Sequence, residues 1–144
     1  MQVRTMTMSD CEQVAAIEAV SFSVPWSLHA FTETLQKENF RYFVAEEDGE
    51  ILGYCGFLFV LDEAEIPNVC VKEAARRRGV GRQMMEALIK EAEKLGMYRL
   101  LLEVRESNVA ARTLYKSLGF CEDGIRKNFY EKPTENAVLM SMTL

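Results

Sequence analysis

The sequence predicts a single α/β domain over residues 1–144, with a mixed sheet and helices on both of its faces. Segments with the alternating pattern of strands and segments with helical spacing follow one another along the chain. The run YRLLLEV (98–104) is almost continuously apolar, which is typical of an interior strand covered on both faces. The 144 residues, 49% of them hydrophobic, suffice for one buried core.

The first half of the chain is predicted to run strand, helix, helix, strand, strand, strand. These segments are residues 1–6, a helix capped at Ser9-Asp10, a helix capped at Ser27, and strands 40–47, 51–62 and 64–72. Pro25 separates the helices because a proline restrains the residue before it. The Asp48-Gly49 pair predicts a tight hairpin. Pro67 lacks an N–H group, so it predicts a bulge or an interrupted ladder.

The second half is predicted to continue helix, strand, helix, strand, strand. These segments are residues 81–96, 98–104, 109–120, 120–125 and 137–143. The first helix has an apolar stripe, made of Met84, Met85, Leu88, Ile89, Ala92 and Leu95. Ser107 or Asn108 caps the second helix, and Gly119 ends it. The strand, helix and strand from Asn68 to Val104 should form a right-handed crossover.

Composition argues against several functions. The net charge of −5 is a poor match for general nucleic-acid binding, which favours a strongly basic surface. The four cysteines (Cys11, Cys55, Cys70 and Cys121) and the single His29 lack the spacing of metal ligands. No apolar run is long enough for a membrane span, and no signal peptide is recognisable. We therefore expect reduced thiols, no metal, no membrane contact and a cytoplasmic location.

The stretch RRRGVG (76–81) leads directly into the first helix of the second half. The start of a helix has unpaired N–H groups and a positive dipole end, and arginines add bonds to phosphate oxygens. The spacing matches neither a P-loop nor a dinucleotide-binding fingerprint. From these residues alone, a phosphate-binding loop and a solvated basic turn both remain possible.

Longer segments resemble a known family. The segment VCVKEAARRRGVGRQMMEALIKEAEKLG resembles the acetyl-CoA-binding core of the Gcn5-related N-acetyltransferase (GNAT) superfamily, with Arg76, Gly79 and Gly81 at its signature positions. LLEVRESNVAARTLYKSLGF resembles the second core motif of the same superfamily. The early PWS and the late IRKNFYEKPTENAVLM resemble its ribosomal-protein alanine N-acetyltransferase branch. The likeness extends over nearly the whole chain.

The resemblance implies a mostly antiparallel sheet of about seven strands, in which a splayed parallel pair binds acetyl-CoA. It also implies direct acetyl transfer to a protein N-terminal peptide, with the N-terminal alanine of a small-subunit ribosomal protein as the first candidate. A monomer or weak dimer is expected, without direct nucleic-acid contact. Fold does not choose the acceptor, so a lysine side chain, a small-molecule amine and a non-catalytic acyl-CoA-binding role stay open.

The resemblance assigns cofactor contacts to a strand, a loop and a helix start. The residues are Val69, Cys70 and Val71 through their main chain, then Arg76, Arg77, Arg78, Gly79, Val80, Gly81 and Arg82, and finally Asn108. The Val71 N–H group would face the thioester oxygen. Arg77, Arg78 and Arg82 would meet the phosphates more directly than Arg76.

Glu103 and Tyr115 are the candidate catalytic residues. Glu103 ends a buried strand, and burial would make it a stronger base, although a salt bridge with Arg105 or Arg99 is an equal reading of the residues alone. Tyr115 follows Asn108 by seven residues, so about 100° per residue places both on one helix face. The resemblance implies that Glu103 is the general base, acting through water, and that Tyr115 is the general acid. Trp26 either shapes the acceptor site or only holds its own loop.

Overall fold

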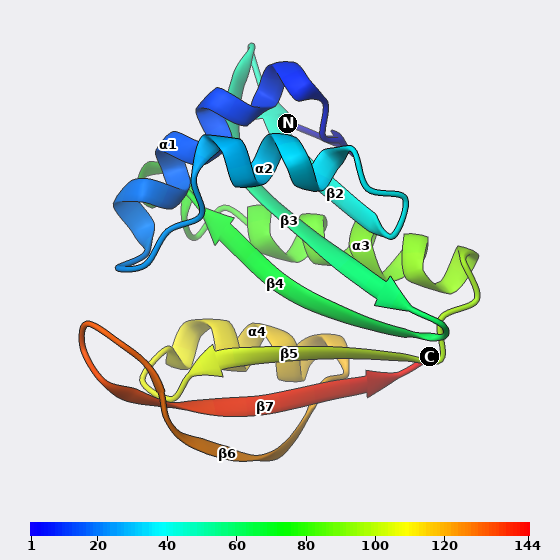
Figure 1. The fold of residues 1–144 in the computed structure, drawn as a ribbon, viewed down its shortest axis with the longest axis vertical. Helices are drawn as coiled ribbons and strands as arrows, with labels where there is room; N and C mark the ends of the chain where they lie inside the picture. Colours follow the sequence, from blue (N-terminus) through cyan, green and yellow to red (C-terminus); the bar gives the residue numbers. More distant parts are fainter.

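The computed structural model describes residues 1–144 and contains one seven-stranded sheet (Figure 1). The strand order across the sheet is β1-β2-β3-β4-β5-β7-β6. All neighbouring strands are antiparallel except β4 and β5, which are parallel. The expected mostly antiparallel sheet with one parallel pair is therefore confirmed.

The predicted order of strands and helices is also confirmed. The strands are β1 (Gln2–Thr5), β2 (Phe40–Glu47), β3 (Glu50–Val60), β4 (Glu63–Val71), β5 (Arg99–Arg105), β6 (Cys121–Tyr130) and β7 (Glu135–Thr143). The helices are α1 (Cys11–Ser21), α2 (Leu28–Leu35), α3 (Val80–Lys94) and α4 (Val109–Leu118). Two single-turn 3-10 helices occupy Met8–Asp10 and Glu73–Ala75.

The prediction for β6 was wrong at its far end. The strand was expected to stop at Ile125, but it continues to Tyr130. Its register with β7 breaks between Arg126 and Tyr130, where Asn128 has a left-handed φ of 53°. Because β6 is an edge strand and is exposed almost throughout, no alternation of apolar and polar residues marks its length.

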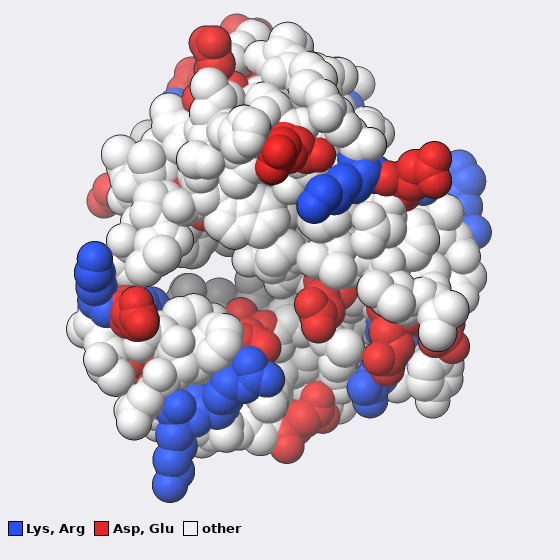
Figure 2. All heavy atoms as spheres, viewed as in Figure 1, with Lys and Arg blue, Asp and Glu red and all other residues white.

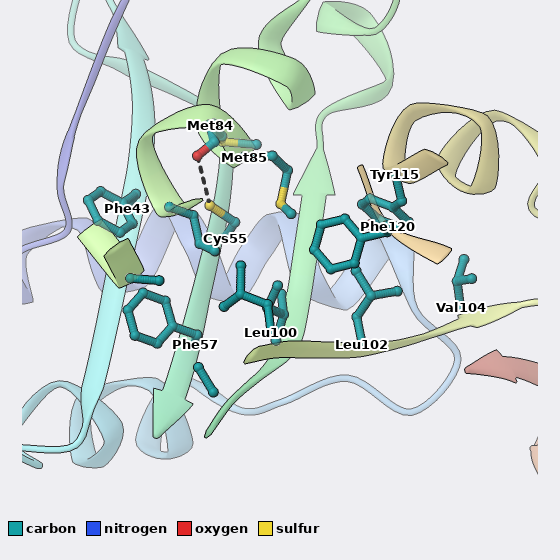
Figure 3. Close-up of a cluster of buried hydrophobic side chains, with 14 of the residues drawn as sticks. Phe43, Cys55, Phe57, Met84, Met85, Leu100, Leu102, Val104, Tyr115 and Phe120 are labelled. Carbon is teal, nitrogen blue, oxygen red and sulfur yellow. Dashed lines mark hydrogen bonds between the residues drawn. The ribbon is translucent and has the colours of Figure 1, made fainter. Parts of the chain in front are cut away.

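Helices cover both faces of the sheet, as predicted: α1 and α2 lie on one face, and α3 and α4 on the other (Figure 1). Figure 3 shows the core on the α3 side of the sheet, where Met84 and Met85 belong to the same buried cluster as Phe57 and Leu100. The predicted cap at Ser27 is confirmed, since the Ser27 hydroxyl accepts a bond from the Ala30 N–H group at 3.1 Å. The predicted cap at Ser9-Asp10 was wrong, because α1 has no side-chain cap and the Asp10 carboxylate accepts the Thr7 N–H group at 2.7 Å instead. Burying each large apolar side chain of the cluster in Figure 3 stabilises the fold by about 1.5–3 kcal/mol.

The parallel pair of β4 and β5 stays joined over only part of its length. Residues Glu63–Ile66 pair with Arg99–Leu102, and the ladder then ends. Pro67 follows at once, and the register between β3 and β4 shifts beside it, opposite Gly56–Leu58. The predicted bulge at Pro67 is therefore confirmed. Beyond it the carboxyl ends of β4 and β5 diverge, which opens the sheet between them (Figure 1).

Candidate active site

A cavity of about 870 Å³ lies where β4 and β5 separate. Its walls come from the end of α1, the loop between α1 and α2, β4 around Pro67, the end of β5, the start of α4 and the turn between β6 and β7. Figure 2 shows the corresponding opening between the half of the molecule with α1 and α2 and the half with β5 to β7. Ligands of open α/β sheets bind at such strand ends.

Glu103 lies on the cavity wall, near the end of β5. The residues of β5 alternate, so Leu102 and Val104 point into the core while Glu103 points to the other face. Its carboxylate lies 3.4 Å from Arg126 Nη1, and its side chain is 31% exposed. The expected burial and the expected partners Arg105 or Arg99 were therefore wrong. Glu103 is an accessible carboxylate with one arginine from β6 beside it.

Tyr115 lines the same cavity from α4. It is 6% exposed, and its ring packs 5.9 Å from that of Phe120. Burial raises the pKa of the Tyr115 hydroxyl above its ordinary value, so it stays protonated throughout the neutral range. Asn108 lines the cavity as well, and its side-chain oxygen caps α4 by accepting the Ala111 N–H group at 3.2 Å. The predicted common face of Asn108 and Tyr115 is confirmed.

The residues Val69–Val71 form a free strand edge. The Lys72 N–H group donates to the Leu52 carbonyl at 2.8 Å, so by antiparallel alternation Cys70 is also paired with β3. The main-chain groups of Val69 and Val71 point the opposite way, toward the gap that β5 has left. The Cys70 main chain is thus engaged in the sheet, whereas those of its two neighbours face the gap.

The loop before α3 has the geometry of an anion site. Arg77 and Gly79 have left-handed φ values of 65° and 79°, and α3 then begins at Val80 without a side-chain cap. The first bond of the helix runs from the Gln83 N–H group to the Gly79 carbonyl at 3.1 Å. The N–H groups of Val80, Gly81 and Arg82 therefore have no helical partner and point outward. This is the backbone arrangement predicted for a phosphate-binding loop.

The arginines of this loop differ in their contacts. Arg76 Nε donates to the Val71 carbonyl at 3.2 Å, which fastens the loop to the end of β4. Arg78 forms an ion pair with Glu47 at 2.6 Å, and Arg82 donates to the Ser117 hydroxyl. Arg77 is exposed. Since Arg78 and Arg82 already have partners in the chain, the backbone N–H groups are the more available anion ligands.

Sequence reasoning missed Glu18, whose carboxylate is buried and lines the cavity. It accepts the Trp26 N–H group at 2.9 Å and the Tyr54 hydroxyl, and Asn68 Nδ2 lies 3.4 Å away. The Tyr42 hydroxyl donates to Asn68 at 2.6 Å. Glu18 follows Val14 by four residues, which places it on the buried face of α1. A carboxylate at a buried helix position was the signal in the sequence that could have revealed Glu18.

Tyr130 and Arg105 are two further cavity residues that sequence reasoning did not assign. The Arg105 guanidinium lies 4.6 Å from the centre of the Tyr130 ring. Burial raises the pKa of Tyr130 to about 12, with the Glu103 charge as a further cause. Arg105 is close to Glu103 in sequence, whereas Tyr130 at the end of β6 comes near Glu103 only in the folded chain.

The chain matches known acetyltransferases over nearly its whole length. Residues 11–120 match the model of the acetyltransferase (GNAT) family. That match covers well over half of the 144 residues. The chain belongs to the GNAT acetyltransferase family. The cavity at the splayed strands is accordingly the candidate site of an N-acetyltransferase.

Individual relatives agree with this family. A Bacillus subtilis protein is 38% identical over 99% of this chain and 95% of its own length. The Escherichia coli protein named ribosomal protein bS18-alanine N-acetyltransferase is 37% identical, covering 99% of this chain and 97% of its own. The crystal structure of the Escherichia coli ribosomal-protein-S18-alanine N-acetyltransferase superposes with a TM-score of 0.91 at 36% identity, over 99% of this chain and 92% of that one. This GNAT chain therefore shares their fold throughout.

Acetyl-CoA is the acetyl donor of GNAT enzymes. Val69 lines the cavity, whereas Val71 and the loop before α3 lie outside its lining, and groups from all three suit acetyl-CoA chemically. The unpaired N–H groups of Val80, Gly81 and Arg82 suit a diphosphate. The free main-chain groups of Val69 and the N–H group of Val71 suit the amides of an extended pantetheine arm, which would lie along β4 as an added strand does. The two sets of groups lie at the end of β4 and the start of α3, which are separated by the 3-10 helix Glu73–Ala75 and the RRRG loop.

Proposed function

We propose that this chain transfers the acetyl group of acetyl-CoA to the N-terminal α-amine of a ribosomal protein, with the N-terminal alanine of protein bS18 as the first acceptor to test. The observation that carries the proposal is the identity of 36–38% over at least 94% of the chain with several proteins named for this reaction. The presence of a carboxylate and a phenol in one cavity supports an enzyme rather than a passive acyl-CoA-binding module.

The reaction forms a C–N bond and breaks the C–S bond of the thioester, which supplies the activated acetyl group. Glu103 removes a proton from the attacking amine through a water molecule, and its exposure leaves room for one. The Val71 N–H group stabilises the negative charge that develops on the carbonyl oxygen. Tyr115, held protonated by burial, donates to the departing thiolate. Both protons are then accounted for without a covalent enzyme intermediate.

Direct transfer also agrees with the surroundings of Cys70. This thiol is buried and does not line the cavity. Burial raises its pKa, so it is a poor nucleophile at neutral pH. The acetyl group therefore passes from the thioester to the amine in a ternary complex.

The test is a continuous assay of CoA release with synthetic peptides. A bS18 N-terminal peptide beginning with a free alanine should be acetylated, and mass spectrometry should place the acetyl group on its α-amine. The same peptide with a blocked N-terminus is the matched control and should not react. Equal turnover of a blocked peptide that contains lysine would contradict the proposed acceptor and favour a lysine acetyltransferase. A cytoplasmic location and a monomer or weak dimer stay predictions.

A further inference from the structure

Arg105 ends β5, two residues after Glu103, so the two side chains leave the strand on the same face. The Arg105 side chain is only 27% exposed. It extends away from the core, past the cavity, to the turn that joins β6 and β7. Arg105 therefore connects β5, which carries the candidate base Glu103, to the β6–β7 turn at the rim of the cavity.

The guanidinium of Arg105 uses both of its terminal nitrogens on that turn. Nη1 donates to the Pro133 carbonyl at 3.0 Å and to the Glu135 carboxylate at 3.1 Å. Nη2 donates to the Glu131 carbonyl at 2.9 Å. The planar group also lies over the Tyr130 ring. Only a rigid, planar group with several donors can make all of these contacts at once.

The same turn is tied to the loop between α1 and α2, on the opposite side of the cavity. The Ser23 hydroxyl donates to the Glu131 carbonyl at 3.1 Å, and Arg105 Nη2 lies 3.5 Å from the Ser23 oxygen. Ser23 and Glu131 are far apart in sequence and come from the two halves separated by the opening in Figure 2. Arg105 and Ser23 thus join the two rims of the cavity.

We propose that Arg105 is a positioning residue for the acceptor: it fastens the β6–β7 turn to the α1–α2 loop and so holds the acceptor side of the cavity in its binding shape. The inference rests on the proposed function, since the acceptor is a peptide held at this rim. Arg105 makes no hydrogen bond to the phosphate-binding loop before α3, so that loop should keep its shape without it. Positive charge alone does not perform this role.

The experiment compares steady-state kinetics of the full chain with Arg105→Gln, Arg105→Lys and Ser23→Ala variants. Arg105→Gln should raise the KM for a free N-terminal peptide by about tenfold or more, because at least one charge-assisted bond is lost. The KM for acetyl-CoA should stay within about twofold of the wild-type value. Arg105→Lys should resemble Arg105→Gln, since the single nitrogen of lysine cannot reproduce the separate contacts of Nη1 and Nη2 or the planar stacking on Tyr130. Ser23→Ala should produce a smaller rise in the peptide KM.

Arg41→Gln is the matched control. Arg41 also donates to two main-chain carbonyls, of Glu38 and Phe40, and lies 5.4 Å from the Phe59 ring, but it does not line the cavity. Its variant should leave both KM values unchanged while lowering thermal stability to a similar degree. Equal rises in both KM values for Arg105→Gln, or full rescue by Arg105→Lys, would overturn the proposal.

Hydrogen exchange separates this inference from the proposed function, because it needs no acceptor. Arg105→Gln should speed amide exchange in residues 22–27 and 130–132 by about tenfold, whereas Arg41→Gln should not. If no N-terminal peptide is a substrate but both segments exchange faster, the proposed acceptor is wrong and the tie between the rims stands. Unchanged exchange in the α1–α2 loop would contradict the tie itself.

Discussion

At the residue scale, Glu103 and Tyr115 owe their chemistry to different surroundings in one cavity. Glu103 is accessible and has Arg126 beside it, which suits a carboxylate that works through water. Tyr115 is buried and packs against Phe120, and this burial raises its pKa so that it keeps its proton at neutral pH. The raised pKa of Tyr115 thus agrees with the proposed acid, and the accessibility of Glu103 agrees with the proposed base.

Glu103→Gln and Tyr115→Phe should each lower kcat by about 10²-fold, which is the usual worth of one acid or base group. Tyr115→Phe keeps the ring that packs on Phe120, so the thermal stability and the KM for acetyl-CoA should change little. Stopped assays of kcat and KM with a free N-terminal peptide measure both effects. If each variant kept the wild-type kcat, the assigned roles would be wrong.

Cys70→Ala should keep nearly full activity, because the thiol is buried outside the cavity and its pKa is raised. A stability loss of about 1 kcal/mol is expected from the smaller side chain. Intact-protein mass spectrometry after incubation with acetyl-CoA should find no acetyl adduct on the wild-type thiol. An adduct together with an inactive Cys70→Ala variant would instead indicate a covalent intermediate.

The sequence was informative for residues that act through regular spacing and uninformative for partners that meet only in space. Asn108 and Tyr115 were placed on one face because a helix repeats on a known angle. The Arg126 partner of Glu103 was missed because it lies on β6, which reaches β5 only through β7. The rim contacts of Arg105 were missed for the same reason, since they depend on how a turn folds.

At the element scale, the loop before α3 depends more on backbone shape than on charge. Gly79 has a left-handed φ of 79°, and any side chain there is strained. Gly79→Val should therefore raise the Kd for acetyl-CoA more than Arg78→Ala, whose guanidinium is already paired with Glu47. Isothermal titration with acetyl-CoA compares the two variants. The reverse order would restore the view of this loop as a simple basic patch.

A second element, β1, is held to the fold by a small ionic cluster. Arg4 pairs with Asp10 at 2.8 Å and with Glu46 at 2.9 Å. The hydrogen bond from Arg4 is the main cause that lowers the pKa of Asp10 below its ordinary value of 3.8. Its stabilising effect is therefore complete above that value and is lost as the pH falls through the lower, folded pKa.

Arg4→Met should lower the free energy of unfolding by about 1 kcal/mol at neutral pH. It should also flatten the fall in stability as the pH drops below 3.8, because the largest cause that lowers the pKa of Asp10 is removed while the bonds from Thr7 remain. Denaturant unfolding at several pH values measures both effects, with Arg41→Met as a control that lacks a carboxylate partner. An unchanged pH dependence would show that this cluster does not contribute.

The order of strands and helices was predictable because apolar residues repeat with a clear period in each interior segment. The ends of the edge strands could not be predicted in this way. The stripe on α3 is confirmed, since Met84, Met85 and Leu88 are fully buried. Pro67 marked its bulge because a missing N–H group breaks any ladder. The length of β6 escaped prediction because an exposed strand needs no apolar face.

At the scale of the whole molecule, the only parallel ladder joins the two parts of the sheet, β1 to β4 and β5 to β7. A ligand that lies in the gap beyond Ile66 would contact both parts. Because such a ligand binds the folded chain and not the unfolded one, acetyl-CoA at about 100 times its Kd should raise the free energy of unfolding by about 2.7 kcal/mol. Thermal unfolding with and without acetyl-CoA measures this, and Gly79→Val should shift less. No shift in Tm at saturating acetyl-CoA would contradict binding in the gap.

The free edge of β4 has a further consequence, which concerns aggregation. Unpaired strand edges can recruit another chain, and proteins usually blunt them. Here β1 is only four residues long, and β6 carries charged residues such as Glu122 and Arg126. The edge at Val69–Val71 instead lies inside the molecule, between β4 and β5. The free edge at Val69–Val71 is therefore enclosed within the fold and is not presented on the outer border of the sheet.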